Sequence, residues 1–580
     1  MSKINRRDLL KYSALSLGSV TVMGGLSACN LDGDNEKTID MSFTHGVASG
    51  DPKSDKVILW TRAKPKDENK NHSLTVNYEL ATDPDFMNIT HNGQSKVSED
   101  SDFTLKVDAI NLSPATDYYY RFKSNGMTSI TGHTKTLPET NTEVSQVKLA
   151  LFSCSNYTAG YFNAYSEAVN MLDLDAAIHL GDYIYEYRMG EYATENAENI
   201  GRALPKDNDV ELLTLEDYRK RYALYRSDLG LSALHAVVPM IVIPDDHEVA
   251  NDTYIDGAEN HSPETEGDFS ERKRNALQAY FEWMPIRPAS SGDNSTIHRS
   301  FQWGSLVNLM MLDTRLSGRS KQLSYTDSSF FNSDGSFNST SFAAAVADDN
   351  RTMLGAEQLQ WLQTELSSSS ATWQVLGQQV LMGKMNLPLE LLLQLGNNDT
   401  SELLTELSSI KARMLNNDPS LSDLELARLN AAAPYNLDAW DGYQYEREVI
   451  YATTNALNKN LVVIAGDTHN AWANNLKNQD GEAVGVEYAV ASVSSPGLED
   501  YLDLDEEAAS GLSQGLNLLI DDLHYNNMYD RGFAVMTFTE DKTQTEWIYV
   551  DTILSTNYNL KVESSYTMEV EAGENMLQSS

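Results

Sequence analysis

The chain has 580 residues, of which 41% are hydrophobic, so it can bury a large core and form more than one domain. It carries 43 lysines and arginines against 84 aspartates and glutamates, a net charge of −41. This charge repels nucleic acid and anionic lipid head groups, and it excludes a basic nucleic-acid platform. An anionic substrate would need local positive charge, which bound metal ions can supply.

The first 29 residues have the layout of a bacterial export signal. The pair Arg6-Arg7 precedes an apolar stretch that closes with Leu26-Ser27-Ala28-Cys29. The paired arginines resemble the signal read by the twin-arginine export machinery, and the closing run resembles a lipobox. We therefore predict a twin-arginine and lipoprotein signal over residues 1–29, with Cys29 as the lipidated residue. The alternative is a soluble periplasmic protein that is cut nearby.

The next part of the chain predicts a tether followed by a β-domain. Residues 30–40 are polar and acidic without periodicity, which is typical of a tether. Segments rich in β-forming residues then alternate with Asp, Asn, Gly and Pro turns: Lys56–Thr61, Leu74–Leu80, Phe103–Val107 and Tyr118–Phe122. We predict an N-terminal β-sandwich over residues 41–140, whose segment Ser113–Tyr118 resembles the corner of a fibronectin-type module. No later segment has the unbroken apolar length of a membrane span, so we expect membrane contact only through Cys29.

From Val147 onward the pattern predicts an α/β domain over residues 147–560. Buried strands alternate with helical stretches, and several strands run directly into a polar cluster: Val147–Ser155, Ala176–Tyr187, Met240–Asn251, Leu306–Arg315, Gln374–Met382 and Leu461–Asn470. Functional groups in open α/β sheets collect at the carboxyl ends of strands. We therefore expect these polar clusters to meet.

Three further segments carry no chemistry that the sequence reveals. Residues 317–349 are rich in Ser, Asn, Asp and Phe and predict a surface insertion. Residues 388–429 carry leucines at helical spacing and predict a helical insertion. Residues 561–580 predict a mobile acidic tail.

Four clusters that each follow a β-run carry the chemical argument. They are Ser153-Cys154-Ser155, Gly181-Asp182-Tyr183-Ile184-Tyr185, Asp245-Asp246-His247-Glu248 and Gly466-Asp467-Thr468-His469. One Asp after a strand is weak evidence, because such residues often cap helices or form turns. Together, the four resemble the calcineurin-like metallophosphoesterase plan, an αββα sandwich around two metals. With the runs Gly46–Pro52, Leu59–Arg62 and Trp440–Tyr443, the chain is similar to the alkaline phosphatase D family over residues 41–560.

This resemblance implies a metal centre in which Asp182 bridges two sites. Cys154, Asp182, Tyr185 and His469 would bind iron as Fe³⁺, because thiolate and phenolate donors suit a trivalent ion. Asp246 and Asp467 would bind Ca²⁺ with backbone or water oxygens, a hard set of ligands. Asp467 replaces the histidine of the wider superfamily, which favours calcium. The alternatives are an inert buried thiol at Cys154 and a core role for Tyr185.

The resemblance also implies the chemistry of the centre. Hydroxide from metal-bound water would attack phosphorus in line. His247 would donate a proton to the leaving alkoxide, and the alternative is a structural histidine. Gln378 and Gln379 end one strand, and either amide could reach metal or phosphate; we name Gln379 as the candidate. Arg62 and Arg447 are further candidate phosphate contacts.

The sequence therefore predicts an exported phosphohydrolase, periplasmic or at the cell surface, that releases phosphate from phosphoesters. One alternative keeps the metals but makes the enzyme a phosphodiesterase or phospholipase D-like enzyme, acting on a phospholipid or a teichoic-acid-like diester. Another is a catalytically inactive surface lipoprotein that binds a partner. An inactive domain would have lost at least one of the four ligands Cys154, Asp182, Asp246 and His469, and none is lost.

Overall fold

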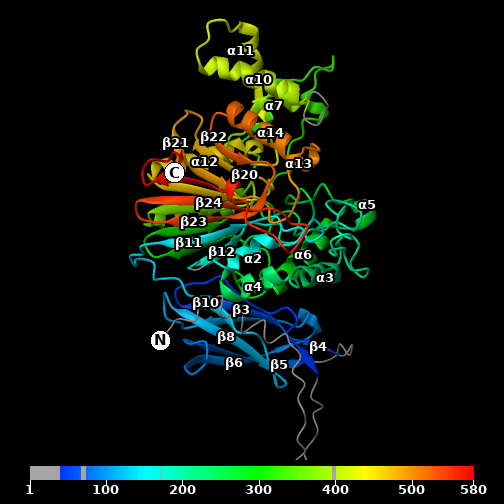
Figure 1. The fold of residues 1–580 in the computed structure, drawn as a ribbon, viewed down its shortest axis with the longest axis vertical. Helices are drawn as coiled ribbons and strands as arrows, with labels where there is room; N and C mark the ends of the chain where they lie inside the picture. Colours follow the sequence, from blue (N-terminus) through cyan, green and yellow to red (C-terminus); the bar gives the residue numbers. More distant parts are fainter. Residues whose placement is uncertain (1–39, 67–72, 172, 395–399, 580) are drawn as a thin grey trace, which may run out of the picture.

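The computed structural model describes residues 40–66, 73–171, 173–394 and 400–579. The predicted signal with Cys29, and the predicted tether up to residue 39, lie outside these ranges. Within them, no helix combines the length and apolar character that crossing a bilayer requires. The molecule is elongated, with the N-terminal strands at one end and a group of helices at the other (Figure 1).

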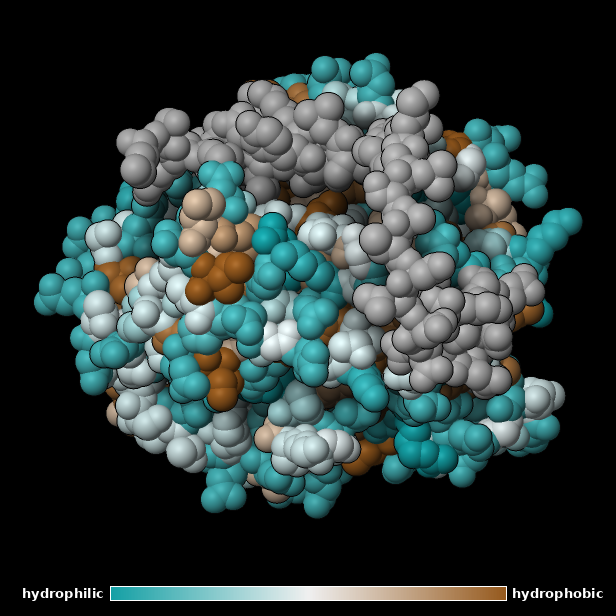
Figure 2. Space-filling view, turned by 90° about the horizontal axis from the view of Figure 1, so that it is seen from below, coloured by the Kyte–Doolittle hydropathy of each residue, from teal (hydrophilic) through white to brown (hydrophobic). Residues whose placement is uncertain are grey.

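The four segments predicted as strands near the N-terminus all form strands. They are β3 (Lys56–Arg62), β5 (Leu74–Ala81), β7 (Thr104–Ile110) and β8 (Asp117–Ser124). Along β8, the buried Tyr118, Tyr120 and Phe122 alternate with more exposed residues, as expected for a strand with one face toward a core. The other strands here are β1 (Met41–Ser42), β2 (Val47–Gly50), β4 (Lys64–Pro65), β6 (Ile89–Val97), β9 (Met127–Thr128) and β10 (Gly132–Lys135). Where grey atoms do not cover this end, hydrophilic side chains are frequent, with smaller hydrophobic patches among them (Figure 2).

These N-terminal strands divide between two sheets. Strands β10, β8, β5 and β6 form one sheet, to which β9 adds. Strands β2, β3 and β7 instead continue a ten-stranded sheet, because β2 pairs with β13 (Met240–Val242) at Gly50 and Met240. Hydrogen bonding therefore continues from the N-terminal strands into the sheet whose strands precede three of the four polar clusters. The predicted sandwich and domain boundaries stay predictions.

Two large sheets bring the ends of their parallel strands together. In the ten-stranded sheet, β11 (Val147–Phe152) runs parallel to β12 (Ala176–His179), which runs parallel to β13. In the seven-stranded sheet, the parallel strands are β15 (Val307–Met311), β16 (Trp373–Gly377), β19 (Asn460–Ala465) and β21 (Ala483–Ala489). The other strands of the two sheets are β14 (Arg299–Trp303), β20 (Ala471–Lys477), β22 (Leu523–Asn527), β23 (Arg531–Phe538), β24 (Lys542–Val550), β25 (Tyr566–Glu571) and β26 (Gln578–Ser579).

Alternate side chains of β19 pack into two different cores. Val462 belongs to the large core that also contains Leu149 of β11. Its neighbour Val463 belongs to a second core, with side chains of α8 (Gly355–Ser368) and α12 (Gln444–Ala456). Because successive strand residues point to opposite faces, sheet lies on one side of β19 and helices lie on the other. The predicted mixed α/β class is confirmed, and the αββα detail stays a prediction.

Other helices contribute to the large core and to the rim of the sheets. Buried residues of α2 (Asn163–Val169), α4 (Leu229–Val237) and α6 (Phe269–Trp283) belong to the core that contains β11 and β12. The remaining helices outside the predicted insertions are α3 (Leu215–Tyr225), α5 (Pro263–Glu266), α13 (Leu498–Tyr501) and α14 (Glu506–Leu519).

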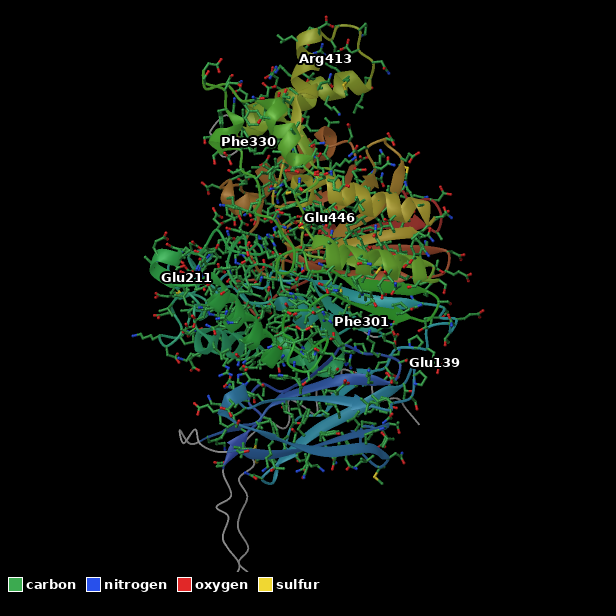
Figure 3. All side chains as sticks on the ribbon, turned by 180° about the vertical axis from the view of Figure 1, so that it is seen from behind. Glu139, Glu211, Phe301, Phe330, Arg413 and Glu446 are labelled. Atoms are coloured by element: carbon green, nitrogen blue, oxygen red, sulfur yellow. The ribbon has the colours of Figure 1, made fainter. Side chains whose placement is uncertain are left out.

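Both predicted insertions lie at the end opposite the N-terminal strands (Figures 1 and 3). The predicted helical insertion contains α9 (Leu389–Leu392), α10 (Thr400–Leu415) and α11 (Asp423–Asn430), flanked by the paired strands β17 (Asn386–Pro388) and β18 (Ala432–Pro434). The insertion over 317–349 includes α7 (Ser339–Val346) and forms a small separate core together with Leu437, in which Phe330 packs edge-on against Phe342.

The prediction of a mobile acidic tail over residues 561–580 is wrong. Strand β25 pairs with β24 from Lys542 to Trp547, and β26 adds two residues beyond it. Within β25, Met568 and Val570 are buried and alternate with polar residues. The acidic composition hid this alternation, which is the pattern of an edge strand with one apolar face.

Candidate metal centre

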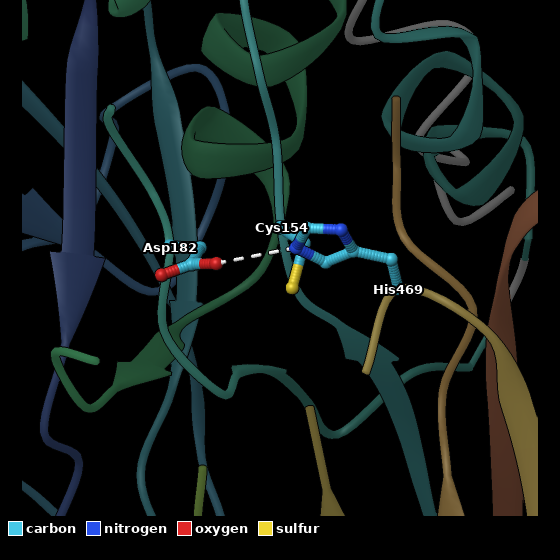
Figure 4. A group of neighbouring side chains, drawn as sticks. All are labelled: Cys154, Asp182 and His469. Carbon is cyan, nitrogen blue, oxygen red and sulfur yellow. Dashed lines mark ion pairs between the residues drawn. The ribbon is translucent and has the colours of Figure 1, made fainter. Parts of the chain in front are cut away.

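Loops that follow β11, β12 and β19 bring Cys154, Asp182 and His469 together. Their potential donor atoms lie within 4.8 Å of one another, and His469 Nε2 lies 3.6 Å from Asp182 Oδ2 (Figure 4). The Tyr185 hydroxyl donates to Asp182 Oδ2 at 2.9 Å, and it lies 3.2 Å from His469 Nε2. It also accepts a hydrogen bond from Ser495 at 2.7 Å. The structure therefore brings together all four residues predicted for the first site.

The backbone at these positions is held in an uncommon conformation. Cys154, Asp182, Asp467 and His469 have φ angles of 58°, 55°, 62° and 60°, in the left-handed region that residues other than glycine rarely adopt. Such strain persists only where the surrounding structure maintains it, and it concentrates at functional sites. Gly181 has a φ of 108°, and a Cβ there would lie 2.4 Å from the Cβ of Asp245. Only glycine, which has no Cβ, fits where the backbone of residue 181 passes Asp245.

A second set of donors continues from the first. Asp182, Asp246 and His247 form one group of donor atoms within 4.8 Å, and Asp245, Asp246 and Asp467 form another. Asp182 belongs to two groups, and so does Asp246. The predicted ligands of the two sites therefore form one continuous cluster.

Glu248 ties the loops of the centre to each other. Its carboxylate accepts hydrogen bonds from the backbone N–H groups of Asp182 at 3.1 Å, Tyr183 at 2.5 Å and Asp245 at 2.7 Å. These bonds fix the backbone on either side of Asp182 and next to Asp246. Glu248 therefore holds the loops that follow β12 and β13 in a fixed position relative to each other.

Arg315 is the main residue that sequence reasoning missed. Its fully buried guanidinium donates to Asp245 at 2.5 Å and to Asp467 at 2.7 Å, and it pairs with Asp438 at 2.8 Å. It lies 3.9 Å from Asp246. The segment Leu306–Arg315 was identified as a strand that ends in a polar cluster, and this was the available signal. Nothing local distinguished Arg315 from a solvated arginine.

His247 is held by a partner that the sequence did not reveal. Its Nδ1 lies 2.7 Å from a carboxylate oxygen of the fully buried Glu186, and its ring packs on Tyr185 with centroids 4.3 Å apart. Burial lowers the pKa of His247, but the carboxylates of Asp246, Asp182 and Glu186 raise it well above its usual value. Cations bound by the same carboxylates would oppose that rise. The geometry is compatible with proton donation or with ligation.

The chemistry of the donor set fits cations. Burial, and after it the charge of Asp182, raises the pKa of the Cys154 thiol well above its ordinary value. Burial also raises the pKa of Asp467 to about 7, although Arg315 opposes the change. Oδ1 of Asp182 and Oδ2 of Asp245 are buried, and neither has a hydrogen-bond partner among the described residues. Nδ1 of His469 is 2.5 Å from the Pro496 carbonyl, which orients Nε2 toward Asp182.

The three candidate substrate contacts are engaged elsewhere. Arg62 pairs with Asp102 and lines a separate cavity of about 840 Å³ beside the N-terminal strands. Arg447 pairs with Asp441 at 2.7 Å. The Gln379 amide accepts from Thr314 and donates to two backbone carbonyls. The structure thus gives no support to a role in substrate binding for Arg62, Gln379 or Arg447.

Comparison with known proteins agrees with this arrangement. Residues 149–547 match the family described as PhoD-like phosphatase, and residues 28–138 match the N-terminal domain of the same family. The chain belongs to the PhoD-like phosphatase family. The family resemblance expected from the four clusters is confirmed, and the protein is a phosphoester hydrolase.

One relative and one solved structure extend the similarity beyond the family pattern. Alkaline phosphatase D of Bacillus subtilis (strain 168) is 34% identical over 499 residues, which are 84% of this chain and 75% of that protein. A solved structure described as the structure of PhoD is 30% identical, with a TM-score of 0.73 over 94% of this chain and 93% of that chain. PhoD-like phosphatases are metal-dependent, which agrees with the cluster of donors described above.

Proposed function

We propose that this phosphohydrolase is an exported enzyme whose centre binds iron and calcium. The observation that carries the proposal is the sharing of Asp182 and Asp246 between adjacent groups of donor atoms. Shared carboxylates are what a centre with two neighbouring cations requires. Export is proposed from the twin-arginine pattern at Arg6-Arg7, and lipid anchoring in the periplasm or at the cell surface is proposed from Cys29.

The proposed ligands separate by chemical character. Cys154, Tyr185 and His469 add a thiol, a phenol and an imidazole to Asp182, a set that suits Fe³⁺. Asp246 and Asp467 add only carboxylate oxygens, which suit Ca²⁺. When bound, the two ions supply positive charge for the phosphoryl oxygens and lower the pKa of water.

His247 is the proposed proton donor for the departing alkoxide. The Glu186 carboxylate accepts from Nδ1, so Nε2 is the nitrogen left for exchange with a substrate. Tyr185 packs on the ring and limits its rotation. The carboxylate of Glu186, which is not among the proposed ligands, favours the protonated imidazole.

Elemental analysis of protein purified after its own export tests the proposal. We expect iron and calcium, together with a visible absorption band from charge transfer between tyrosinate or thiolate and iron. Tyr185→Phe should shift or abolish that band. The control is Tyr183→Phe, whose hydroxyl lies 2.9 Å from Nε2 of His235 in the core. An active preparation that contains zinc alone would contradict the proposed metals.

Monoester and diester hydrolysis are both compatible with this centre. The reading as an inactive lipoprotein is less well supported, because no proposed ligand is missing and the donors converge. Assays with phosphomonoesters and with bis(4-nitrophenyl) phosphate distinguish the two activities. Hydrolysis of neither class by metal-loaded protein would argue for the inactive alternative.

A further inference from the structure

Aromatic side chains line the edge of the centre beside His247. The ring of Tyr192 lies parallel to that of His247, with an interplanar angle of 5° and centroids 6.5 Å apart. The ring of Tyr187 lies 5.4 Å from the same histidine. Tyr192 is fixed in place, because its hydroxyl donates to the Pro496 carbonyl at 2.8 Å. These rings therefore stand beside the residue that we propose as proton donor to the leaving group.

Tyr501 extends this row of rings toward solvent. Its ring is 13° from parallel with Tyr192, with centroids 6.3 Å apart, and 66% of the residue is exposed. A single exposed apolar side chain is ordinary on a protein surface. Tyr501 differs because it is the exposed end of a row that begins at His247.

The position of Tyr501 relative to the centre is built into the fold. Tyr501 lies on α13, whose first residue Leu498 donates its backbone N–H to the Asn470 side chain at 3.1 Å. The same side chain donates to Glu499 at 3.3 Å, and Glu499 pairs with Arg531. Because Asn470 directly follows His469, the loop that carries a proposed ligand also holds α13 in place.

We propose that Tyr187, Tyr192 and Tyr501 form an aromatic shelf that binds a planar ring in the alcohol part of the ester. Nucleoside and aryl phosphoesters are then the preferred class of substrate. The inference rests on the proposed function, since it takes His247 to face the leaving group. Stacking on tyrosine adds affinity without using positive charge, which acidic residues outnumber in a protein with a net charge of −41.

Paired substrates that differ only in the ring test the shelf. Adenosine 5′-phosphate and ribose 5-phosphate share the same ester bond and leaving oxygen, and the nucleotide carries a base where the sugar phosphate carries the C1 hydroxyl. We expect metal-loaded enzyme to favour the nucleotide in kcat/KM by about fivefold or more, the lower bound for stacking one base on an aromatic ring. Tyr501→Ala should bring that ratio close to one, mainly through KM, and Tyr501→Trp should preserve it.

A second stacked tyrosine provides the control. Tyr566 lies on β25, is 37% exposed and stacks on Tyr525 with centroids 4.3 Å apart. Tyr566→Ala should leave the substrate ratio as in the parent protein. The same variants are assayed on a diester pair, the methyl phosphodiesters of the same two 5′-alcohols, with release of adenosine or ribose measured, so that a strict diesterase is also tested.

The outcomes separate the shelf from the proposed function. A parent enzyme that hydrolyses both members of a pair equally well, or a Tyr501→Ala variant that keeps the preference, overturns the shelf and leaves the hydrolase intact. Failure to hydrolyse any of the four esters overturns the proposed function, and the shelf with it.

Discussion

The two sides of the metal centre balance their negative charge in different ways. Around Asp182, the partners are a thiol, a phenol and a histidine, and no lysine or arginine of the described residues forms an ion pair with it. Around Asp245 and Asp467, the buried Arg315 supplies a positive charge from within the chain. The first side therefore depends on a bound cation for its charge balance, whereas the second is partly balanced before any cation binds.

The replacement Asp182→Asn should have the largest effect, because it removes a carboxylate that belongs to two groups of donors. We expect iron and calcium to be lost together, and activity on every ester to fall by more than the roughly 100-fold typical of residues around a ligand. Metal content and kcat/KM measure both effects. Asp441→Asn, which alters a buried carboxylate paired with Arg447, is the control. Retention of either metal by Asp182→Asn would show that the two sides are independent.

Replacing His247 by Ala should slow esters with alkoxide leaving groups by roughly 100-fold to 10,000-fold, the usual contribution of general acid catalysis. Nitrophenyl esters should lose far less, because nitrophenolate departs without a proton. Glu186→Gln should show the same selectivity with a smaller loss of roughly 10-fold to 100-fold, as expected for a residue that orients another. Equal losses on both kinds of ester, or a loss of metal, would reassign His247 as a ligand.

Arg315→Met tests the internal charge of the second side. In metal-free protein, the change leaves buried carboxylates without their partner, which typically lowers the free energy of unfolding by about 3–5 kcal/mol. Calcium should restore part of this loss, as measured by urea unfolding. Arg447→Met removes a buried arginine with a single carboxylate partner outside the centre, so calcium should not rescue it. Equal rescue of both variants would contradict a calcium site at Asp246 and Asp467.

The last expected effect is a dependence of the stability of the metal-free protein on pH. The pKa of Asp467 is raised from 3.8 to about 7, mainly by burial, so between these values the folded state holds a proton that the unfolded chain has released. The free energy of unfolding should therefore fall as pH rises from about 4 to about 7. Asp467→Asn should reduce the slope. An unchanged slope would mean that other buried acids, such as Glu487 with its pKa of about 7, dominate the response.

The sequence predicted those residues of the centre that stand in a recognisable local pattern. Strands followed by Cys154, Asp182 and His469 were recognisable, because each carries a reactive side chain directly after a buried run. Arg315 and Glu186 escaped notice because their roles come from contacts 70 and 61 residues away along the chain. From the sequence alone, an arginine or a glutamate whose partner lies far away along the chain cannot be distinguished from a surface residue.

The fold shows the same division between local and distant information. The alternation of buried residues along β8 is a local signal and gave a correct strand. The pairing of β2 with β13 joins Gly50 to Met240, and the residues near either position do not predict this pairing. Strand β25 was overlooked because acidic composition was given more weight than the alternation of Met568 and Val570.

Strand β25 also affects how the molecule behaves in solution. It pairs with β24 from Lys542 to Trp547, and among the described residues only the two-residue β26 lies beyond it, too short to pair extensively with another chain. A protein shortened after Lys561 would expose the stretch of β24 that β25 covers, from Lys542 to the buried Trp547, as an open edge. Such a chain would be expected to self-associate. An expression tag should therefore be added after Ser580 and should not replace β25 and β26.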